Sequence, residues 1–186
     1  MQGTRTFSRK RIIFFIVIPI IVLAALIAFD QITKHLVENN QTNIAVIDNF
    51  FYISYTVNSG AGFSFLADKS WGQTLFKIIT PVALVGFGVF YYFAVKKPYK
   101  WLTYALMLII SGTIGNYIDR LVNSRVVDFL RFQFGSYFFP TFNVADICLT
   151  VGVIMLIIHF FFFDDSAIFK KKPKAVEETR EDDENL

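Results

Sequence analysis

Two aspartates, Asp128 and Asp146, have the residue type and surroundings needed for hydrolysis. Asp128 lies in segment 112–129 and Asp146 in segment 142–146, and each segment is a polar island at one end of a hydrophobic run. Ionisable groups at the edge of a low-dielectric phase are costly and usually functional. Two carboxyls that share a site cannot both ionise cheaply, so one keeps a proton while the other activates water. A turn cap at Asp128 and a helix N-cap at Asp146 would use the same residues, and spacing alone leaves both interpretations open.

A second polar group precedes Asp128. If the run from residue 101 to about 118 is helical, Asn116, Asp119 and Arg120 fall at positions i, i+3 and i+4. An amide, a carboxylate and a guanidinium would then share one face at the helix end, where Asp119 could hold Arg120. Gly112 and Gly115 carry no side-chain bulk, so another backbone or a ligand could approach this helix closely.

The composition is that of an integral membrane protein. The 186 residues are 54% hydrophobic, include 23 Phe and have a mean hydropathy of +0.49; this apolar share is far above that of a soluble domain. The single cysteine, Cys148, excludes an internal disulfide. His35 and His159 are far apart in the sequence and lack partners at metal-ligand spacing. We therefore expect no metal and no cofactor, and nothing in the sequence indicates nucleic-acid binding.

Four apolar runs have the length that a spanning helix needs. They predict a single membrane domain over residues 1–186, an all-α bundle of four transmembrane helices at about 12–29, 75–95, 101–118 and 144–163. Basic residues gather before the first run, between the second and third, and after the fourth. By the positive-inside rule, segments 1–11, 96–100 and 164–186 are cytoplasmic, as are both termini. Segments 30–74 and 119–143 are then extracytoplasmic, which places the polar residues at the outer leaflet.

The two outer segments contain weaker signals. Residues 39–43 read as a polar loop, and alternation over 51–57 and 63–65 around a turn at 58–62 predicts an extended hairpin, a small β part on the outer face. The Phe-rich stretch between Arg120 and Thr141 predicts an interfacial lid segment. The acidic tail from Glu177 to Leu186 is expected to be disordered and without a catalytic role.

Motifs in four separated blocks of the chain resemble one known family, the bacterial lipoprotein signal peptidases, also called signal peptidase II or prolipoprotein signal peptidase. The sequence has Gly-x-x-x-Asn-x-x-Asp-Arg at 112–120, Val-Val-Asp-Phe at 126–129 and Phe-Asn-x-Ala-Asp at 142–146. Upstream it has Asp-x-x-x-Lys at 30–34 and Asn-x-Gly-x-x-Phe at 58–63. Gly62 stands where the family usually has Ala, a mild departure.

The resemblance implies an intramembrane aspartic endopeptidase in the bacterial plasma membrane. Its substrates would be diacylglyceryl-modified prolipoproteins, cleaved on the N-terminal side of the lipidated cysteine, with membrane lipids around it. Asp128 and Asp146 would be catalytic, sharing one proton. Residues that bind substrate or support the site would be Asp30, Lys34, Asn58, Gly60, Asn116, Asp119, Arg120, Asn143 and Ala145.

Two other functions use similar residues. A small transporter or channel subunit would use the acidic groups as an ion or proton path, but such a path also needs ionisable groups at mid-depth and on the inner side, and the second and fourth apolar runs show no such chain. A serine protease would need a Ser with a His partner, and His159 lies far from Ser111 and Ser124. Four helices with one site are compatible with a monomer.

Overall fold

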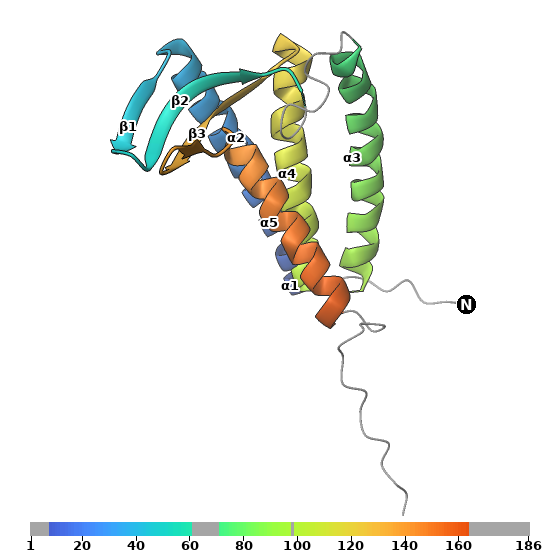
Figure 1. The fold of residues 1–186 in the computed structure, drawn as a ribbon. Coiled ribbons are helices and arrows are strands. Elements are labelled where there is room, and N and C mark those ends of the chain that lie inside the picture. Colours follow the sequence, from blue (N-terminus) through green and yellow to red (C-terminus); the bar gives the residue numbers. More distant parts are fainter. Residues whose placement is uncertain (1–7, 61–70, 98, 164–186) are drawn as a thin grey trace, which may run out of the picture.

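Helices that can cross a membrane form most of the molecule (Figure 1). The computed structural model describes residues 8–60, 71–97 and 99–163, and four of its helical stretches are long and apolar enough to span a bilayer. The first comprises α1 (Arg9–Ile12), the π-helical η1 (Ile13–Val17) and α2 (Ile18–Asn39). The others are α3 (Gly72–Lys96), α4 (Lys100–Asn123), and α5 (Val144–Ile158) with its π-helical extension η3 (His159–Phe163). The prediction of a mainly helical, multi-pass membrane protein is confirmed.

Two of these helices extend beyond the apolar runs that predicted them. α2 continues to Asn39 rather than ending near residue 29, and α4 continues to Asn123 rather than 118. Hydropathy marks only the apolar part of a helix, whereas the backbone hydrogen bonds continue into polar sequence. As a result, Asp30, Lys34, Asp119 and Arg120 lie on helical turns with fixed directions.

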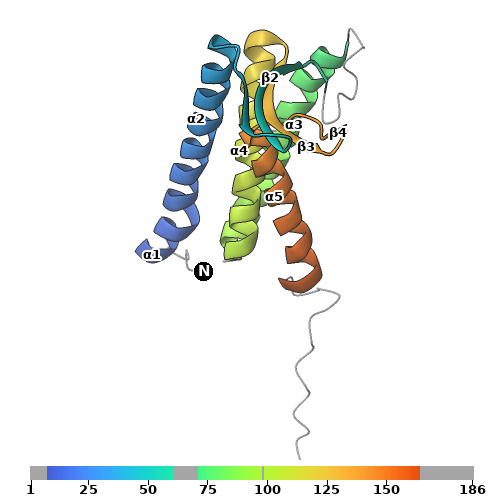
Figure 2. The same ribbon diagram turned by 60° about the vertical axis from the view of Figure 1, so that its left-hand side comes forward.

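α4 is the central helix of the bundle. α2, α3 and α5 all pack against it, and Figure 2 shows α2 and α3 on either side of α4. Glycines allow the closest approach between α4 and α5: a Cβ added to Gly112 would lie 2.3 Å from the Ala145 carbonyl oxygen, and one added to Gly152 would lie 2.8 Å from that of Ala105. The first turn of α5 is therefore held directly against α4.

A small antiparallel sheet lies at one end of the helices (Figure 1). Its strands are β1 (Asn43–Ile47), β2 (Phe51–Asn58), β3 (Val126–Phe134) and β4 (Tyr137–Phe138), paired in the order β1-β2-β3-β4. In this register Thr56 lies opposite Asp128. Asp128 is therefore held by the pairing of β3 with β2, whereas β4 pairs with β3 only at Gln133 and Phe134.

The strand over residues 51–57 is confirmed, but its partners differ from the predicted hairpin. β2 pairs with β1 through a turn at residues 48–50, in which Asn49 has a positive φ of 58°. The predicted second arm at 63–65 lies outside the described residues. The Phe-rich stretch predicted as an interfacial lid segment forms β3 and β4. Its partner β2 is about 70 residues earlier and supplies pairing that local sequence does not reveal.

A short connection joins β3 to α5 and brings the two aspartates together. The Phe142 carbonyl accepts hydrogen bonds from the amides of Phe129 and Leu130, at 3.0 and 2.8 Å, and the Phe142 amide donates to the Leu130 carbonyl at 3.1 Å. Residues 139–142 thus return along β3. The start of α5 is thereby placed beside Asp128.

Candidate active site

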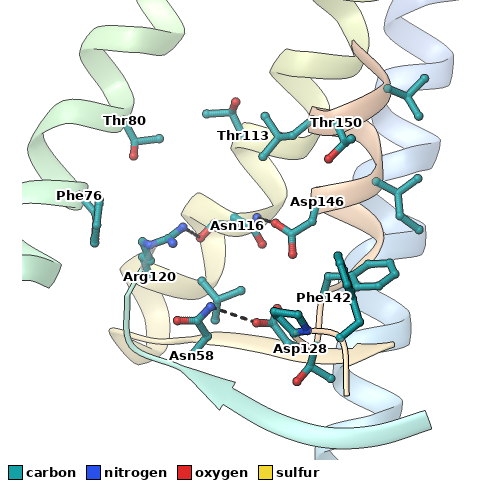
Figure 3. Close-up of a pocket in the computed structure, with 17 residues that line it drawn as sticks. Asn58, Phe76, Thr80, Thr113, Asn116, Arg120, Asp128, Phe142, Asp146 and Thr150 are labelled. Carbon is teal, nitrogen blue, oxygen red and sulfur yellow. Dashed lines mark hydrogen bonds between the residues drawn. The ribbon is translucent and has the colours of Figure 1, made fainter. Parts of the chain in front are cut away.

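Asp128 and Asp146 line the same pocket. Asp128 comes from β3 and Asp146 from the first turn of α5, and both carboxyl groups border a cavity of about 630 Å³ between the sheet and the helices (Figure 3). The predicted convergence of these two carboxylates from separate segments is therefore present in the geometry.

Asparagine amides hold both carboxylates. The Asn143 side chain donates to Asp128 Oδ1 at 2.7 Å, and the Asn58 side chain donates to Asp128 Oδ2 at 3.1 Å. The Asn116 side chain donates to Asp146 Oδ1 at 2.8 Å, and the Asn143 backbone amide donates to Asp146 Oδ2 at 3.1 Å. Every carboxylate oxygen of the pair thus has a neutral donor, which fixes its orientation without an opposing charge in direct contact.

The helix-cap interpretation holds beside this arrangement. Asn143, not Asp146, is the N-cap of α5, and its side-chain oxygen accepts from the Asp146 amide at 2.9 Å. Asp146 is the third residue of the helix and completes a reciprocal capping box. Asp146 therefore stabilises the helix start with one oxygen while it faces the pocket.

The environment of Asp128 favours its protonated form. Burial, followed by the nearby charge of Asp146, raises the pKa of Asp128 from its ordinary value of 3.8 to about 7, although hydrogen bonds from Asn58 and Asn143 act in the opposite direction. A pair of carboxyls that holds one proton near neutral pH can use one member as the acid and the other as the base.

A buried lysine lies behind the asparagines. Lys34 is 3% exposed, and its Nζ contacts Asp30 at 2.8 Å, Asp119 at 2.9 Å and the Asn116 side-chain oxygen at 3.0 Å. The three protons of the ammonium thus have three acceptors. Because Asn116 accepts from Lys34 through its oxygen, its NH₂ group must point toward Asp146. Lys34 therefore sets the orientation of the amide that holds one aspartate.

The two carboxylates that pair with Lys34 also accept hydrogen bonds from backbone amides of the site. Asp30 Oδ1 accepts from the Ala145 amide at 2.8 Å, and Asp119 Oδ2 accepts from the Val127 amide at 3.3 Å. These amides belong to residues adjacent to Asp146 and Asp128. Gly115 makes room for this contact, because a Cβ there would lie 2.7 Å from Asp30 Oδ2.

Arg120 lies on the other side of the pocket and corrects one expectation. Asp119 pairs with Lys34 rather than holding Arg120. Arg120 donates to the carbonyls of Gly60 at 3.0 Å and Asn116 at 3.2 Å, and its guanidinium lies 5.1 Å from the centre of the Phe76 ring. The predicted group of Asn116, Asp119 and Arg120 therefore splits between two sides of α4, and Arg120 connects this helix to the end of β2.

The structure brings all eleven predicted site residues into this one region. Gly62 and Phe63, from the motif that begins at Asn58, lie outside the described residues. Sequence reasoning missed Gln31, which donates to Gly115 O at 3.1 Å and Asp119 Oδ1 at 3.0 Å, and four pocket-lining threonines, of which Thr141 precedes the Phe-Asn-x-Ala-Asp motif. Gln31 lies inside the Asp-x-x-x-Lys block, but a threonine in an apolar run gives no signal of its own. Missed residues that line the pocket include Phe76, Thr80, Thr113, Pro140, Phe142, Leu149, Thr150 and Val151.

Metal ligands are not grouped in the part of the chain that the structure describes, where no cluster of three or more His, Cys, Asp or Glu side chains is placed to hold an ion. What the described residues provide is a pair of carboxylates, their amide donors and one guanidinium. This set can activate water and bind peptide carbonyl groups.

Comparisons with known proteins point to a single family. The family model described as "Signal peptidase (SPase) II" matches residues 7–162. A lipoprotein signal peptidase of Bacillus pumilus is 43% identical over 73% of this chain and 87% of its own length. One of Symbiobacterium thermophilum is 39% identical over 75% of this chain and 91% of its own length.

Solved structures give the same fold. A bacterial membrane enzyme determined by the in meso method at 2.3 Å resolution is 35% identical, with a TM-score of 0.68 over 77% of this chain and 87% of that chain. A second such structure, at 1.9 Å resolution, is 34% identical with the same TM-score over 77% and 92% of the two chains. The transporter or channel alternative is not favoured by any of these findings. The chain belongs to the signal peptidase II family, and its function is the removal of signal peptides from prolipoproteins.

Proposed function

We propose that this protease is of the aspartic type, with Asp128 and Asp146 as its catalytic pair. The observation that carries the proposal is that two carboxyls from separate segments border one pocket, each held by neutral amide donors. A metal or a nucleophilic side chain is not needed for hydrolysis by such a pair.

The chemistry follows from one shared proton. The ionised carboxylate removes a proton from water, whose oxygen attacks the scissile carbonyl carbon, while the protonated carboxyl gives its proton to the carbonyl oxygen. Collapse of the tetrahedral intermediate breaks the C–N bond, and the leaving amine takes a proton from the pair. The raised pKa of Asp128 supports the presence of one proton on the pair at neutral pH.

The remaining residues divide into two roles. Asn58 and Arg120 line the pocket, and Gly60 is buried beside it and accepts a hydrogen bond from Arg120; these three residues would bind the substrate main chain near the scissile bond. Asp30, Lys34, Asn116, Asp119, Asn143 and Ala145 orient the two carboxylates through the hydrogen bonds described above.

The substrate proposed is a diacylglyceryl-modified prolipoprotein, cleaved on the N-terminal side of the lipidated cysteine. Most of the pocket wall beside the dyad is apolar, including Phe76, Leu149 and Val151. Such a wall suits a signal helix and acyl chains better than a soluble peptide. The enzyme would act as a monomer, since one chain supplies both carboxyls and all of their donors.

The location proposed is the bacterial plasma membrane, with the site at the outer leaflet and both termini in the cytoplasm. Arg9, Lys10, Lys96, Lys97 and Lys100 lie at the helix ends far from the sheet, and a positive end is typically cytoplasmic. Surrounding lipids would contact the apolar outer faces of the helices.

The test is cleavage of a purified diacylglyceryl-modified prolipoprotein by the wild type, Asp128→Asn and Asp146→Asn. Both substitutions keep the side-chain size and remove the carboxyl, so each should reduce kcat by at least about 10³-fold, in the range seen when a catalytic group is lost. Asp48→Asn, in the exposed turn between β1 and β2, is the matched control and should cleave normally. Near-normal turnover by either folded pocket variant would eliminate the two-carboxylate mechanism.

A further inference from the structure

Three threonines line the pocket on the side away from the sheet. Thr80 lies on α3, Thr113 on α4 and Thr150 on α5, so each helix around the cavity contributes one hydroxyl (Figure 3). Thr150 follows Asp146 by one helical turn, which is about 6 Å of rise. With the orientation proposed above, this set lies deeper in the membrane than the two carboxyls.

Two of these hydroxyls are available to a ligand. Threonines in helices commonly donate to the carbonyl one turn earlier, and Thr113 does so to Ile109 O at 2.7 Å, as does Thr103 to Tyr99 O at 3.0 Å. Among the described residues, the hydroxyls of Thr80 and Thr150 have no such partner. Thr80 is half-buried and Thr150 is exposed, and both line the pocket, so both hydroxyls can donate to a group that enters it.

The substrate of the proposed reaction has acceptors at this depth. A signal helix that delivers its scissile bond to the carboxyls must end just before that bond, and the last four carbonyls of a helix have no partner within it. Within a bilayer no water compensates for them. These carbonyls belong to residues on the N-terminal side of the cleaved bond, which lie on the membrane side of the dyad.

We propose that Thr80 and Thr150 donate hydrogen bonds to main-chain carbonyls in the last turn of the bound signal peptide, and so bind the end of its helix in the open form that cleavage requires. The inference rests on the proposed function. Main-chain carbonyls are common to every signal peptide, so contacts of this kind bind substrates of differing sequence. Apolar neighbours such as Phe76 and Val151 then accept the side chains.

The experiment compares Thr80→Val, Thr150→Val and the double variant with the wild type, using a diacylglyceryl-modified prolipoprotein in lipid nanodiscs. Valine keeps the shape and removes the hydroxyl. Each single variant should raise KM about 2- to 10-fold, the effect expected for the loss of one neutral hydrogen bond. The KM of the double variant should rise by about the product of the two single factors. Serine at either position should restore the wild-type value, and Thr74→Val, on α3 outside the pocket, should change nothing.

A second substrate separates main-chain carbonyls from the other acceptors nearby. A prolipoprotein that carries a dialkyl ether in place of the diacylglyceryl group lacks ester carbonyls. On this substrate the valine variants should show the same fold increase in KM as on the diacylglyceryl substrate. If that increase disappears on the ether substrate, the threonines bind the lipid esters and the inference is wrong. It is also wrong if folded valine variants cleave either substrate like the wild type. Absence of cleavage by the wild type itself would instead overturn the proposed function.

Discussion

At the scale of single residues, neutral amides rather than cations contact the two carboxyls. Asn58, Asn116 and Asn143 supply the side-chain donors. An arginine or lysine in direct contact would favour full ionisation and lower the carboxyl pKa values. Lys34 instead acts one hydrogen bond away, through the oxygen of Asn116. The arrangement fixes the geometry of the acids and still allows one of them to keep a proton.

The pH dependence of cleavage should reflect that proton. The pKa of Asp128 is raised to about 7, so the pair loses its last proton as the pH rises through about 7, and kcat should fall on that side. Asn58 stabilises the ionised form of Asp128, so its removal raises this pKa. Asn58→Leu should therefore shift the descending limb of the kcat profile to higher pH. A limb that shifts to lower pH, or does not move, would contradict this assignment.

The same proton affects stability. A carboxyl whose pKa is higher in the folded protein than in the unfolded chain contributes stability that is fully present below about pH 4 and is lost as the pH rises through about 7. Asp128→Asn, which cannot ionise, should remove this part of the pH dependence. Denaturant unfolding of both proteins between pH 4 and 8 measures it, and parallel curves for the two proteins would contradict the raised pKa.

Lys34 should contribute strongly to stability because its partners are buried. Lys34→Met leaves the carboxylates of Asp30 and Asp119 without their cation, which should cost about 3–5 kcal/mol of unfolding free energy. Adding Asp119→Asn to that variant restores the net charge of the group and should recover part of the loss. Denaturant unfolding in detergent measures both variants, and an equally unstable double variant would show that the buried charge is not the cause.

At the scale of secondary-structure elements, the contact between α4 and α5 fixes the position of the helical turn that carries Asp146. Gly112→Ala would place a methyl group 2.3 Å from the Ala145 carbonyl oxygen, which is backbone and cannot rotate away. The helices must separate, so we expect a loss of about 1–3 kcal/mol and slower cleavage, because Asp146 follows Ala145 directly. Thermal unfolding and a cleavage assay provide the test.

Gly88→Ala is the matched control for that substitution. A Cβ at Gly88 on α3 meets nothing within 4 Å, and alanine favours a helix over glycine by about 1 kcal/mol. This variant should be as stable as the wild type or slightly more stable, with unchanged cleavage. A Gly88→Ala variant as damaged as Gly112→Ala would show that the α4–α5 contact is not what matters.

The elements also show what the sequence could predict. The four helices follow from apolar runs, because a bilayer imposes a minimum length on any helix that spans it. The i, i+4 spacing of Asp30 and Lys34 indicates their ion pair, but the other partners of Lys34 were not predictable, since Asn116 and Asp119 are more than 80 residues away and meet it only in the packed bundle. The pairing of β2 with β3 was not predictable for the same reason, because the two strands are far apart in the sequence. Local pattern indicates that a segment is a strand, whereas tertiary contacts decide its neighbour.

At the scale of the whole molecule, the helix ends far from the sheet are basic, whereas charges of both signs occur near the sheet. Among the described residues, the acidic side chains are Asp30, Glu38, Asp48, Asp119, Asp128 and Asp146, and all lie toward the sheet. Basic residues gather at the opposite helix ends, where Arg11 donates to the Val95 carbonyl at 2.8 Å and connects α1 to the end of α3. This distribution predicts a fixed orientation in the membrane.

Cysteine labelling can measure that orientation because the chain has a single cysteine. In a Cys148→Ala background, Asp48→Cys lies in the exposed turn of the sheet and Lys97→Cys at the exposed end of α3. A membrane-impermeant maleimide should label the first in intact spheroplasts and the second only after permeabilisation. The reverse pattern would place the carboxyl pair on the cytoplasmic side.

The pocket wall formed by α3 and α5 has a consequence for how the enzyme is measured. Both helices are long and apolar enough to span a bilayer and pack on α4, and the surface of the cavity between them is largely apolar. The substrate is itself confined to that bilayer, so it arrives by two-dimensional diffusion and competes with lipid for the same space. The meaningful KM is therefore a mole fraction of substrate in lipid. Adding lipid at constant enzyme and substrate should slow cleavage, whereas diluting the same proteoliposomes with buffer should leave the rate per enzyme unchanged.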